Sequence, residues 1–209
     1  MKVPLIGISR HRLGSDGEGV TTLVTFHGCP LRCKYCLNPQ CLHKNGVWRE
    51  LDEKAVYDNV VIDNLYFLAT GGGITFGGGE PCVRSEFIKH FCSLIPEQWN
   101  IDVETCLNVE RRHLVTLKSL VNHYFIDIKD MNPDIYIRYT GRSNRRVIGN
   151  LRWLASQGLA DKVTIRLPHI PDYNTPEDVV KSRNILENMG FKDFDEFEYI
   201  TNIDKYKKL

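Results

Sequence analysis

The sequence lacks the features that mark membrane, secreted and nucleic-acid-binding proteins. No uncharged apolar run approaches the roughly 20 residues of a transmembrane helix, and residues 1–10 contain no signal-peptide core. Lys and Arg number 27 against 26 Asp and Glu, so the net charge of +1 gives no basis for broad binding to nucleic acid or to an anionic membrane. Two short basic runs, 111–112 and 142–146, are typical of solvated helix ends or loops. These absences favour a cytoplasmic protein without nucleic-acid or membrane partners.

The cysteines do not form a pattern that is typical of disulfides. The chain has seven of them, an odd number, and the cytoplasm is reducing, so cysteines that cluster are better explained by metal binding or catalysis. No low-complexity linker or charge block divides the 209 residues. We therefore expect a single domain over residues 1–209, which is long enough to bury a core.

Strand-like and helix-like segments alternate along the chain. Segments rich in β-branched and aromatic residues predict strands at 20–26, 73–76, 101–107, 124–129, 163–167 and 194–200. Apolar spacing and capping residues predict helices at 51–68, 85–95, 111–120, 145–157 and 175–189, the last two of which end before Gly158 and Gly190. Ser85 and Thr175 are the expected N-caps. This α/β alternation indicates a parallel sheet. Six units are too few to close an eight-stranded barrel, so we expect a partial, TIM-like (β/α)6 barrel with active residues at the C-terminal strand ends.

Three cysteines follow the first predicted strand with the spacing C-x3-C-x2-C: Cys29, Cys33 and Cys36. Thiolates suit iron–sulfur clusters and zinc, but structural zinc sites close with four ligands and no partner pair follows downstream. A 4Fe-4S cluster held by three thiolates leaves one iron open to chelate an amino acid. Cys41 is a conceivable fourth ligand. Outside the triplet, cysteines are more often buried or incidental than ligands, and here these are Cys41, Cys82, Cys92 and Cys106.

A glycine-rich run at residues 71–79, followed by Glu80 and Pro81, ends the second predicted strand. Glycine allows a backbone to approach a ligand closely and leaves its N–H and C=O groups free to bind it. A tight turn would need the same residues. The position of this run, after a cysteine triplet and at a strand end, favours the ligand-binding interpretation.

These motifs resemble the radical SAM superfamily, whose signature is C-x3-C-x-aromatic-C followed by Gly-Gly-Glu. Within it, the chain is similar to the glycyl-radical-enzyme activating enzymes. The similarity rests on Asp-Gly-Glu-Gly at 16–19, Gly-Gly-Gly-Ile-Thr at 71–75, Ile-Asp-Ile-Lys-Asp-Met-Asn at 126–132 and Thr-Gly-Arg-Ser-Asn at 140–144. It extends from about residue 16 to residue 200.

The resemblance implies a radical SAM core with one 4Fe-4S cluster and S-adenosylmethionine (SAM) as cofactors. Reductive cleavage of SAM would give a 5′-deoxyadenosyl radical that takes hydrogen from a glycine of a partner glycyl radical enzyme, with flavodoxin or ferredoxin as electron donor. The implied SAM contacts are Tyr35, Cys36, Leu37, Gly78, Gly79, Glu80, Asp127, Ile128 and Lys129. Strand alternation sends Asp127 and Lys129 to the same side, where an ion pair within a polar interior is the competing interpretation. Arg166 is a weaker candidate for the same cavity.

The chain also departs from this family. The matching segment after the third strand offers Asn108 where an Asp-Thr pair helps to hold a monovalent cation, and Asn202 stands near the position of a histidine. No ferredoxin-like insert separates Asn38 from Leu51, so we expect one cluster. The family's C-terminal extension is a further feature that the sequence up to Leu209 does not match. Two alternatives stay open: a radical SAM enzyme that acts on a peptide or small metabolite, and a non-catalytic domain that binds zinc and no SAM.

Overall fold

The computed structural model describes residues 1–199 and 201, which form one eight-stranded sheet in the order β3-β1-β2-β4-β5-β6-β7-β8. Six of these strands run parallel, as predicted, and neighbours along the chain are neighbours in the sheet. They are β2 (Val20–Phe26), β4 (Gly73–Gly78), β5 (Asn100–Thr105), β6 (His123–Asp127), β7 (Val163–His169) and β8 (Asp193–Glu198). Among the described residues β8 has no second neighbour. The sheet is therefore an open, partial barrel.

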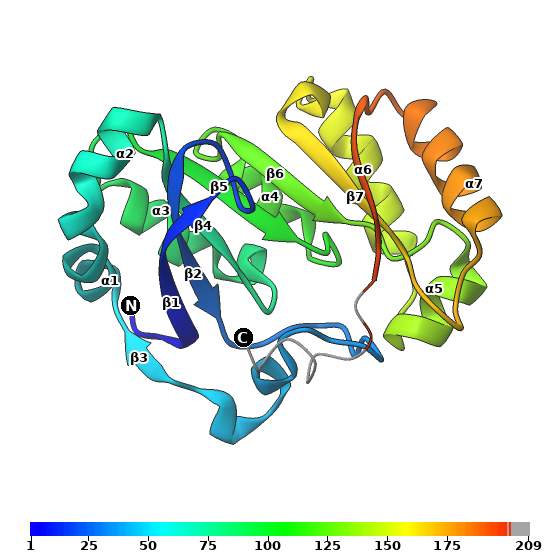
Figure 1. The fold of residues 1–209 in the computed structure, drawn as a ribbon, viewed down its shortest axis with the longest axis horizontal. Helices are drawn as coiled ribbons and strands as arrows, with labels where there is room; N and C mark the ends of the chain where they lie inside the picture. The colour runs from blue at the N-terminus through cyan, green and yellow to red at the C-terminus, as the bar shows by residue number, and fades with distance from the viewer. Residues whose placement is uncertain (200, 202–209) are drawn as a thin grey trace.

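Helices cover the outer face of the curved sheet, and its inner face is open toward the viewer in Figure 1. They are α1 (Glu53–Val60), α2 (Asn64–Thr70), α3 (Ser85–Cys92), α4 (Arg111–Leu117), α5 (Pro133–Thr140), α6 (Arg145–Ser156) and α7 (Pro176–Glu187). The loop after β2 runs along the lower edge and reaches the region of α5. Within the described residues, no helix is long and apolar enough to cross a membrane.

Two strands were not predicted. β1 (Val3–Leu13) pairs antiparallel with β2, and β3 (Arg49–Leu51) pairs antiparallel with β1. The edge strand is β3, and β1 lies between β3 and β2. The second half of β1 is largely exposed, so its polar side chains do not alternate with apolar ones as they do in a half-buried strand. These strands extend the six-stranded core on the side of β2.

The helix predicted at 51–68 is broken in two, and the cause is Asp63. Its carboxylate is fully buried and pairs with Arg10 of β1, with Arg10 Nε 2.7 Å from Asp63 Oδ2. A short 3-10 segment, Val61–Asp63, brings the carboxylate to this position and changes the phase of the helix. The predicted apolar stripe therefore ends here, and Ile62 and Leu65 are exposed.

Helix capping follows the local sequence at some ends and not at others. Thr175 caps α7 in a capping box with Asp178, as the Thr-Pro start predicts. Ser85 is not an N-cap, because α3 begins at Ser85 itself and its hydroxyl lies 2.8 Å from His113 Nδ1. The helix α5 was not predicted, although Asn132 caps it.

Candidate active site

The loop after β2 carries the cysteine triplet. A backbone hydrogen bond from Gly28 N to Cys41 O (3.0 Å) closes the loop at its base. A second, from Lys34 N to Tyr139 O on α5 (3.2 Å), holds its far side. All three triplet thiols are free, and they share this one loop at the C-terminal end of β2.

A cavity of about 620 Å³ lies at the C-terminal ends of the parallel strands, within the size range of small-molecule sites. This is the end at which the sequence analysis placed the active residues. Each parallel strand, or the loop that follows it, contributes to the wall. Eight of the predicted site residues line it: Cys29, Cys33, Cys36, Leu37, Gly78, Gly79, Asp127 and Lys129.

The glycine turn at the end of β4 packs directly on the base of the cysteine loop. Gly78 has φ of +92°, a conformation that favours glycine. A Cβ at Gly79 would lie 2.2 Å from Gly28 O, so only glycine fits there. The turn therefore brings two backbone units, rather than side chains, to the cavity wall.

Glu80 follows this turn but points away from the cavity. Its carboxylate is fully buried and accepts hydrogen bonds from Thr105 Oγ1 (2.7 Å), Cys106 N (2.9 Å) and Cys82 N (3.0 Å). Burial raises the pKa of Glu80, and these donors oppose that rise. In this structure Glu80 positions the end of β5 against the glycine turn.

Asp127 and Lys129 lie on the same side of their segment, as strand alternation predicts. Lys129 Nζ is 3.6 Å from Asp127 Oδ2 and lies over the ring of Tyr199 at 5.5 Å. Lys129 is only 8% exposed. Burial lowers its pKa, but the charges of Asp127, Tyr199, Cys33 and Cys106 together outweigh burial and raise it. Ile128, between them, is buried and does not line the cavity. The competing ion-pair interpretation thus describes a real contact, and the pair still faces the cavity.

Tyr35 is placed outside the cavity wall. Its ring packs against Tyr139 and Tyr173, with centroids 6.2 and 5.7 Å away, and its hydroxyl donates to Asp172 at 3.1 Å. The aromatic residue of the motif therefore joins a small tyrosine cluster beside the cysteine loop.

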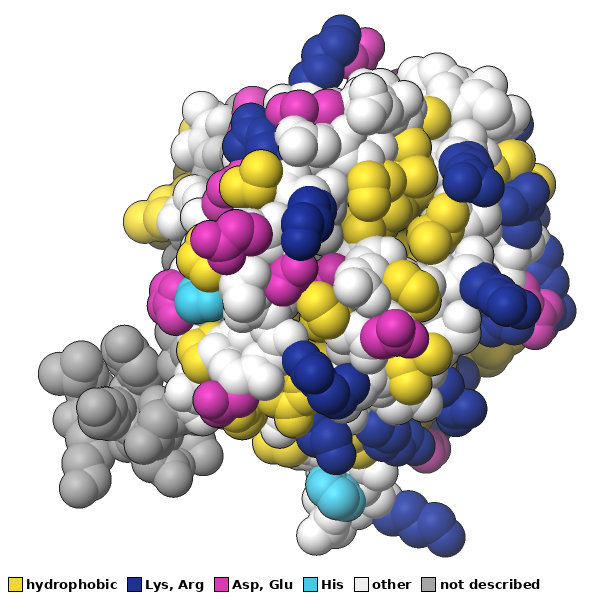
Figure 2. Space-filling view, turned by 90° about the vertical axis from the view of Figure 1, so that its right-hand side faces the viewer, with side chains coloured by type: hydrophobic (Ala, Val, Ile, Leu, Met, Phe, Trp, Pro, Cys, Tyr) yellow, Lys and Arg dark blue, Asp and Glu magenta, His cyan; other side chains and the backbone are white. Residues whose placement is uncertain are grey.

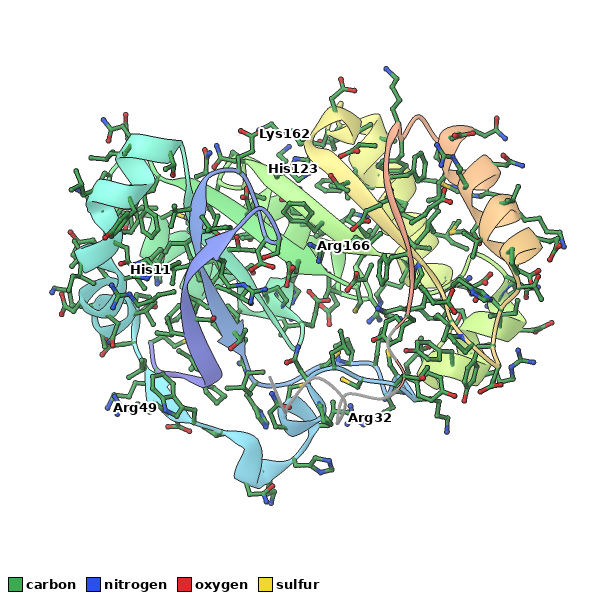
Figure 3. All side chains as sticks on the ribbon, viewed as in Figure 1. His11, Arg32, Arg49, His123, Lys162 and Arg166 are labelled. Carbon is green, nitrogen blue, oxygen red and sulfur yellow. The ribbon has the colours of Figure 1, made fainter. Side chains whose placement is uncertain are left out.

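Arg166 lines the cavity and connects three separate segments. Its Nη1 lies 2.7 Å from Glu104 Oε1, its Nε lies 3.8 Å from Asp195 Oδ2, and its Nη2 donates to Ser15 O at 3.0 Å. Figure 3 shows Arg166 in the middle of the sheet and Arg32 on the loop at the lower edge. The weaker sequence candidate is thus central to the polar wall.

Sequence reasoning missed several residues of this wall. Glu104 and Asp195 face the cavity from β5 and β8, and Arg12 faces it from β1 in an ion pair with Asp16. The available signal was weak: alternation places Glu104 on one face of its strand but does not say that this face is the inner one. For Asp16, the sequence signal is its place in the Asp-Gly-Glu-Gly segment at 16–19, which does not indicate a partner.

Two of the four other cysteines also belong to this cavity. Cys41, 1% exposed, lies with its thiol beside that of Cys36, and Cys106 lies beside Cys29. The contact with Cys41 lowers the pKa of Cys36 to about 6, whereas burial raises the pKa of Cys33 to about 12. Cys41 and Cys106 are thus buried, in line with the expectation for cysteines outside the triplet, and their thiols also lie at the cavity.

The chain departs from the family at Asn108 and Asn202, and the structure describes only the first of these two positions. The amide of Asn108 donates to Ser143 O at 3.1 Å, and the residue does not line the cavity. Asn202 lies outside the described residues, as does Ile200 of the last predicted strand.

The donor set fits an iron–sulfur cluster better than a single metal ion. Among residues 1–199 and 201, no three His, Cys, Asp or Glu side chains converge closely enough to hold one ion. The ligands of a cubane bind different irons and need a wider spacing, and soft thiolates are its usual donors. Cys29, Cys33 and Cys36 would hold such a group at the wall of a cavity with room for a further ligand.

Comparison with known proteins supports this assignment. The family model described as "Radical SAM superfamily" matches residues 23–184. The pyruvate formate-lyase-activating enzyme of Clostridium pasteurianum is 31% identical over 93% of this chain and 82% of its own length. This chain belongs to the radical SAM superfamily, in the family of pyruvate formate-lyase-activating enzymes. It is therefore an enzyme of SAM-dependent radical chemistry, and the non-catalytic alternative no longer holds.

Other radical SAM proteins are similar as well. The pyruvate formate-lyase 2-activating enzyme of Escherichia coli K12 is 30% identical over 81% of this chain and 67% of its own length. Among solved structures, Streptococcus suis SuiB bound to S-adenosylmethionine superposes with a TM-score of 0.67 at 14% identity, over 85% of this chain and 40% of that one. HemN of E. coli superposes with a TM-score of 0.63 at 16% identity, over 92% and 47%. This chain spans less than half the length of either solved protein, and both confirm the radical SAM fold.

Proposed function

We propose that this enzyme binds one 4Fe-4S cluster through Cys29, Cys33 and Cys36, cleaves SAM reductively, and abstracts hydrogen from a glycine of a partner glycyl radical enzyme. One observation carries the proposal: three free thiols on a single loop share a cavity with the glycine turn and the Asp127–Lys129 pair. The names of the curated relatives support the glycyl radical partner.

The cavity provides suitable groups for each part of SAM. The backbone units of Gly78 and Gly79 suit its amino group, since glycine allows close approach. Lys129 suits a carboxylate and Asp127 suits hydroxyl or ammonium donors. Leu37 lines the cavity and suits an apolar ring, whereas the ring of Tyr35 lies outside the cavity wall, against Tyr139 and Tyr173. A bound cluster would supply one electron and an open iron, and cleavage of the C–S bond would leave methionine and the 5′-deoxyadenosyl radical.

The same cavity explains how a protein glycine would reach the radical. The inner face of the sheet is open in Figure 1, so an extended loop has access without threading through a closed barrel.

The first experiment tests SAM chemistry. The chain is reconstituted anaerobically with iron and sulfide, reduced with dithionite and mixed with SAM, and 5′-deoxyadenosine and methionine are measured. We expect both products, and a cluster EPR signal that changes when SAM binds. Cys33→Ala should lose its iron, whereas Cys92→Ser, a change of a thiol outside the cavity, should keep it. Iron retained in Cys33→Ala would refute the ligand assignment.

A second experiment tests the substrate. The reduced enzyme and SAM are incubated with pyruvate formate-lyase, and the glycyl EPR doublet is recorded. A doublet supports the proposal. Formation of 5′-deoxyadenosine without a doublet from any glycyl radical enzyme tried would point to the peptide or small-metabolite alternative.

A further inference from the structure

The outer side of the cysteine loop is strongly basic. Arg32 and Lys34 alternate with the triplet cysteines; both are exposed, and neither lines the cavity. The guanidinium of Arg32 donates to Cys29 O at 2.9 Å, so a positive charge contacts the backbone of one predicted cluster ligand. The loop therefore presents thiols to the cavity and cations to solvent.

A distant segment adds to the same surface. The turn after α5 contacts the cysteine loop: Arg32 N donates to Thr140 O at 2.9 Å, and Arg142 Nε donates to Pro30 O at 3.2 Å. This contact places Arg142, the first residue of the basic run at 142–146, against the loop that carries the triplet, whereas the sequence predicts the run to be a solvated helix end or loop. We define the basic face as the exposed side chains of Arg32, Lys34, Arg138, Arg142, Arg145 and Arg146.

The charge of the basic face is not neutralised by its surroundings. None of the ion pairs formed within residues 1–199 and 201 includes any of these six side chains. Figure 2 shows Lys and Arg gathered along the lower and right-hand parts of this side of the molecule, with few Asp or Glu among them. The whole chain carries only +1, so this is a local concentration of charge.

Helix stability does not account for this arrangement. Arg145 and Arg146 are the first two residues of α6, where the helix dipole favours anions and disfavours cations. Acidic residues at these positions would stabilise the helix. The positive charges of Arg145 and Arg146 therefore do not stabilise α6, but they could bind a negatively charged partner.

The proposed reaction needs such a partner. Each SAM cleavage consumes one electron, and the electron must arrive from another molecule, since a side chain that gave up an electron would itself have to be reduced before the next turnover. We propose that the basic face docks an acidic one-electron donor protein of the flavodoxin or ferredoxin class. The donor is oxidised by one electron and the cluster gains it; no atom or proton is transferred. This inference rests on the proposed function and adds the surface through which the electron is supplied.

The position of the basic face suits this role. Arg32 and Lys34 of this face belong to the cysteine loop itself, and Arg142 contacts the loop backbone, so a donor bound there lies against the loop that carries the triplet. Complementary charge accelerates association and makes it sensitive to salt. The cavity lies on the other side of the loop, so donor and glycine substrate would occupy different surfaces.

The test reverses charge at two positions whose side chains make no hydrogen bond within the described part of the chain, Lys34→Glu with Arg145→Glu. The matched control is Lys89→Glu with Lys162→Glu, which makes the same change in net charge; Lys162 lies at the opposite edge from Arg32 in Figure 3. Flavodoxin and ferredoxin are each titrated against the reconstituted enzyme by calorimetry at low and high ionic strength. We expect at least one donor to bind the wild type and the control, and the Lys34/Arg145 variant to bind it about tenfold or more weakly at low salt.

Kinetics separate this inference from the proposed function. The donor-driven rate of cluster reduction, followed by stopped-flow absorbance, should fall in parallel with affinity, and SAM cleavage driven by dithionite should be unchanged. The neutral variant Lys34→Gln with Arg145→Gln should give an intermediate loss. Equal donor binding by all variants, or an equal loss in the control, would overturn the docking surface. Failure of the dithionite reaction in the wild type would overturn the proposed function, while the calorimetry would still judge the surface.

Discussion

Replacing Asp102 with asparagine is expected to change how stability depends on pH. Asp102 lies on β5, is 4% exposed, and faces a second cavity of about 420 Å³ at the N-terminal strand ends. Burial, with a smaller contribution from the charge of Glu18, raises the pKa of Asp102 from 3.8 to about 7; a backbone contact at His123 opposes the rise. The carboxyl group therefore takes up a proton in the folded chain at a pH where it is ionised in the unfolded chain.

The sign and size of the effect follow from this shift. The folded chain holds the proton more tightly, so the free energy of unfolding of the wild type falls as pH rises from about 4 to about 7. Each pH unit costs about 1.4 kcal/mol, and the full shift corresponds to an upper limit of about 4 kcal/mol. The asparagine side chain has no proton to lose in this range. The free energy of unfolding of Asp102→Asn should therefore increase relative to that of the wild type as pH rises from about 4 to about 7. Below about pH 4 this difference should not change with pH, because Asp102 is protonated in both the folded and the unfolded chain.

The assay is urea unfolding of the cluster-free chain at a series of pH values, with variant and wild type compared at each. Subtracting the two curves removes the contribution of other titrating groups. Asp161→Asn is the control, because the side chain of Asp161 is 87% exposed. A difference between Asp102→Asn and the wild type that stays flat, or falls, between about pH 4 and 7 would refute this reasoning.

Three other substitutions test the packing and charge of the site. Gly79→Ala places a Cβ 2.2 Å from the backbone oxygen of Gly28 and should lower the free energy of unfolding by about 1–3 kcal/mol, measured by thermal unfolding. The control Gly149→Ala, whose Cβ has its nearest contact at 3.5 Å, should be neutral or stabilising. Equal effects of the two substitutions would contradict the close packing at Gly79. Asp63→Asn removes a fully buried charge from its arginine partner and should cost about 3 kcal/mol in urea unfolding, and a cost below about 1 kcal/mol would contradict the importance of this ion pair. Asp127→Asn leaves Lys129 buried without its carboxylate and should weaken SAM binding about tenfold by calorimetry; unchanged affinity would remove Asp127 from the proposed contacts.

Local sequence predicted the parts of the fold that local forces determine. Every parallel strand except β8 is buried or half-buried along its length, and the cysteine and glycine motifs carry their own spacing. The antiparallel strand β1 was missed because pairing with β2, rather than its own pattern, makes it a strand. The break in the helix predicted at 51–68 depends on Arg10, which is distant in sequence from Asp63.

The site was predictable only where a motif named it. Glu104, Asp195 and Arg12 reach the cavity because the sheet curves, and curvature is a property of all strands together. Cys41 and the basic run at 142–146 were visible but uninformative, because their meaning depends on the loop they contact. The net charge of +1 likewise gave no sign of the basic face, because a sum over the whole chain does not show where the charges lie.

The Arg166 contacts have a consequence for how the open barrel keeps its shape. A closed barrel is held by a continuous ladder of backbone hydrogen bonds between its first and last strands. Here one guanidinium reaches from β7 to Ser15, in the connection between β1 and β2, and so joins the two sides of the gap. A contact made by one side chain is lost when a few hydrogen bonds break, whereas separating two paired strands breaks a whole row of backbone hydrogen bonds. Glu104 and Asp195 contact the same guanidinium, so a change in either charge would alter the contact across the gap.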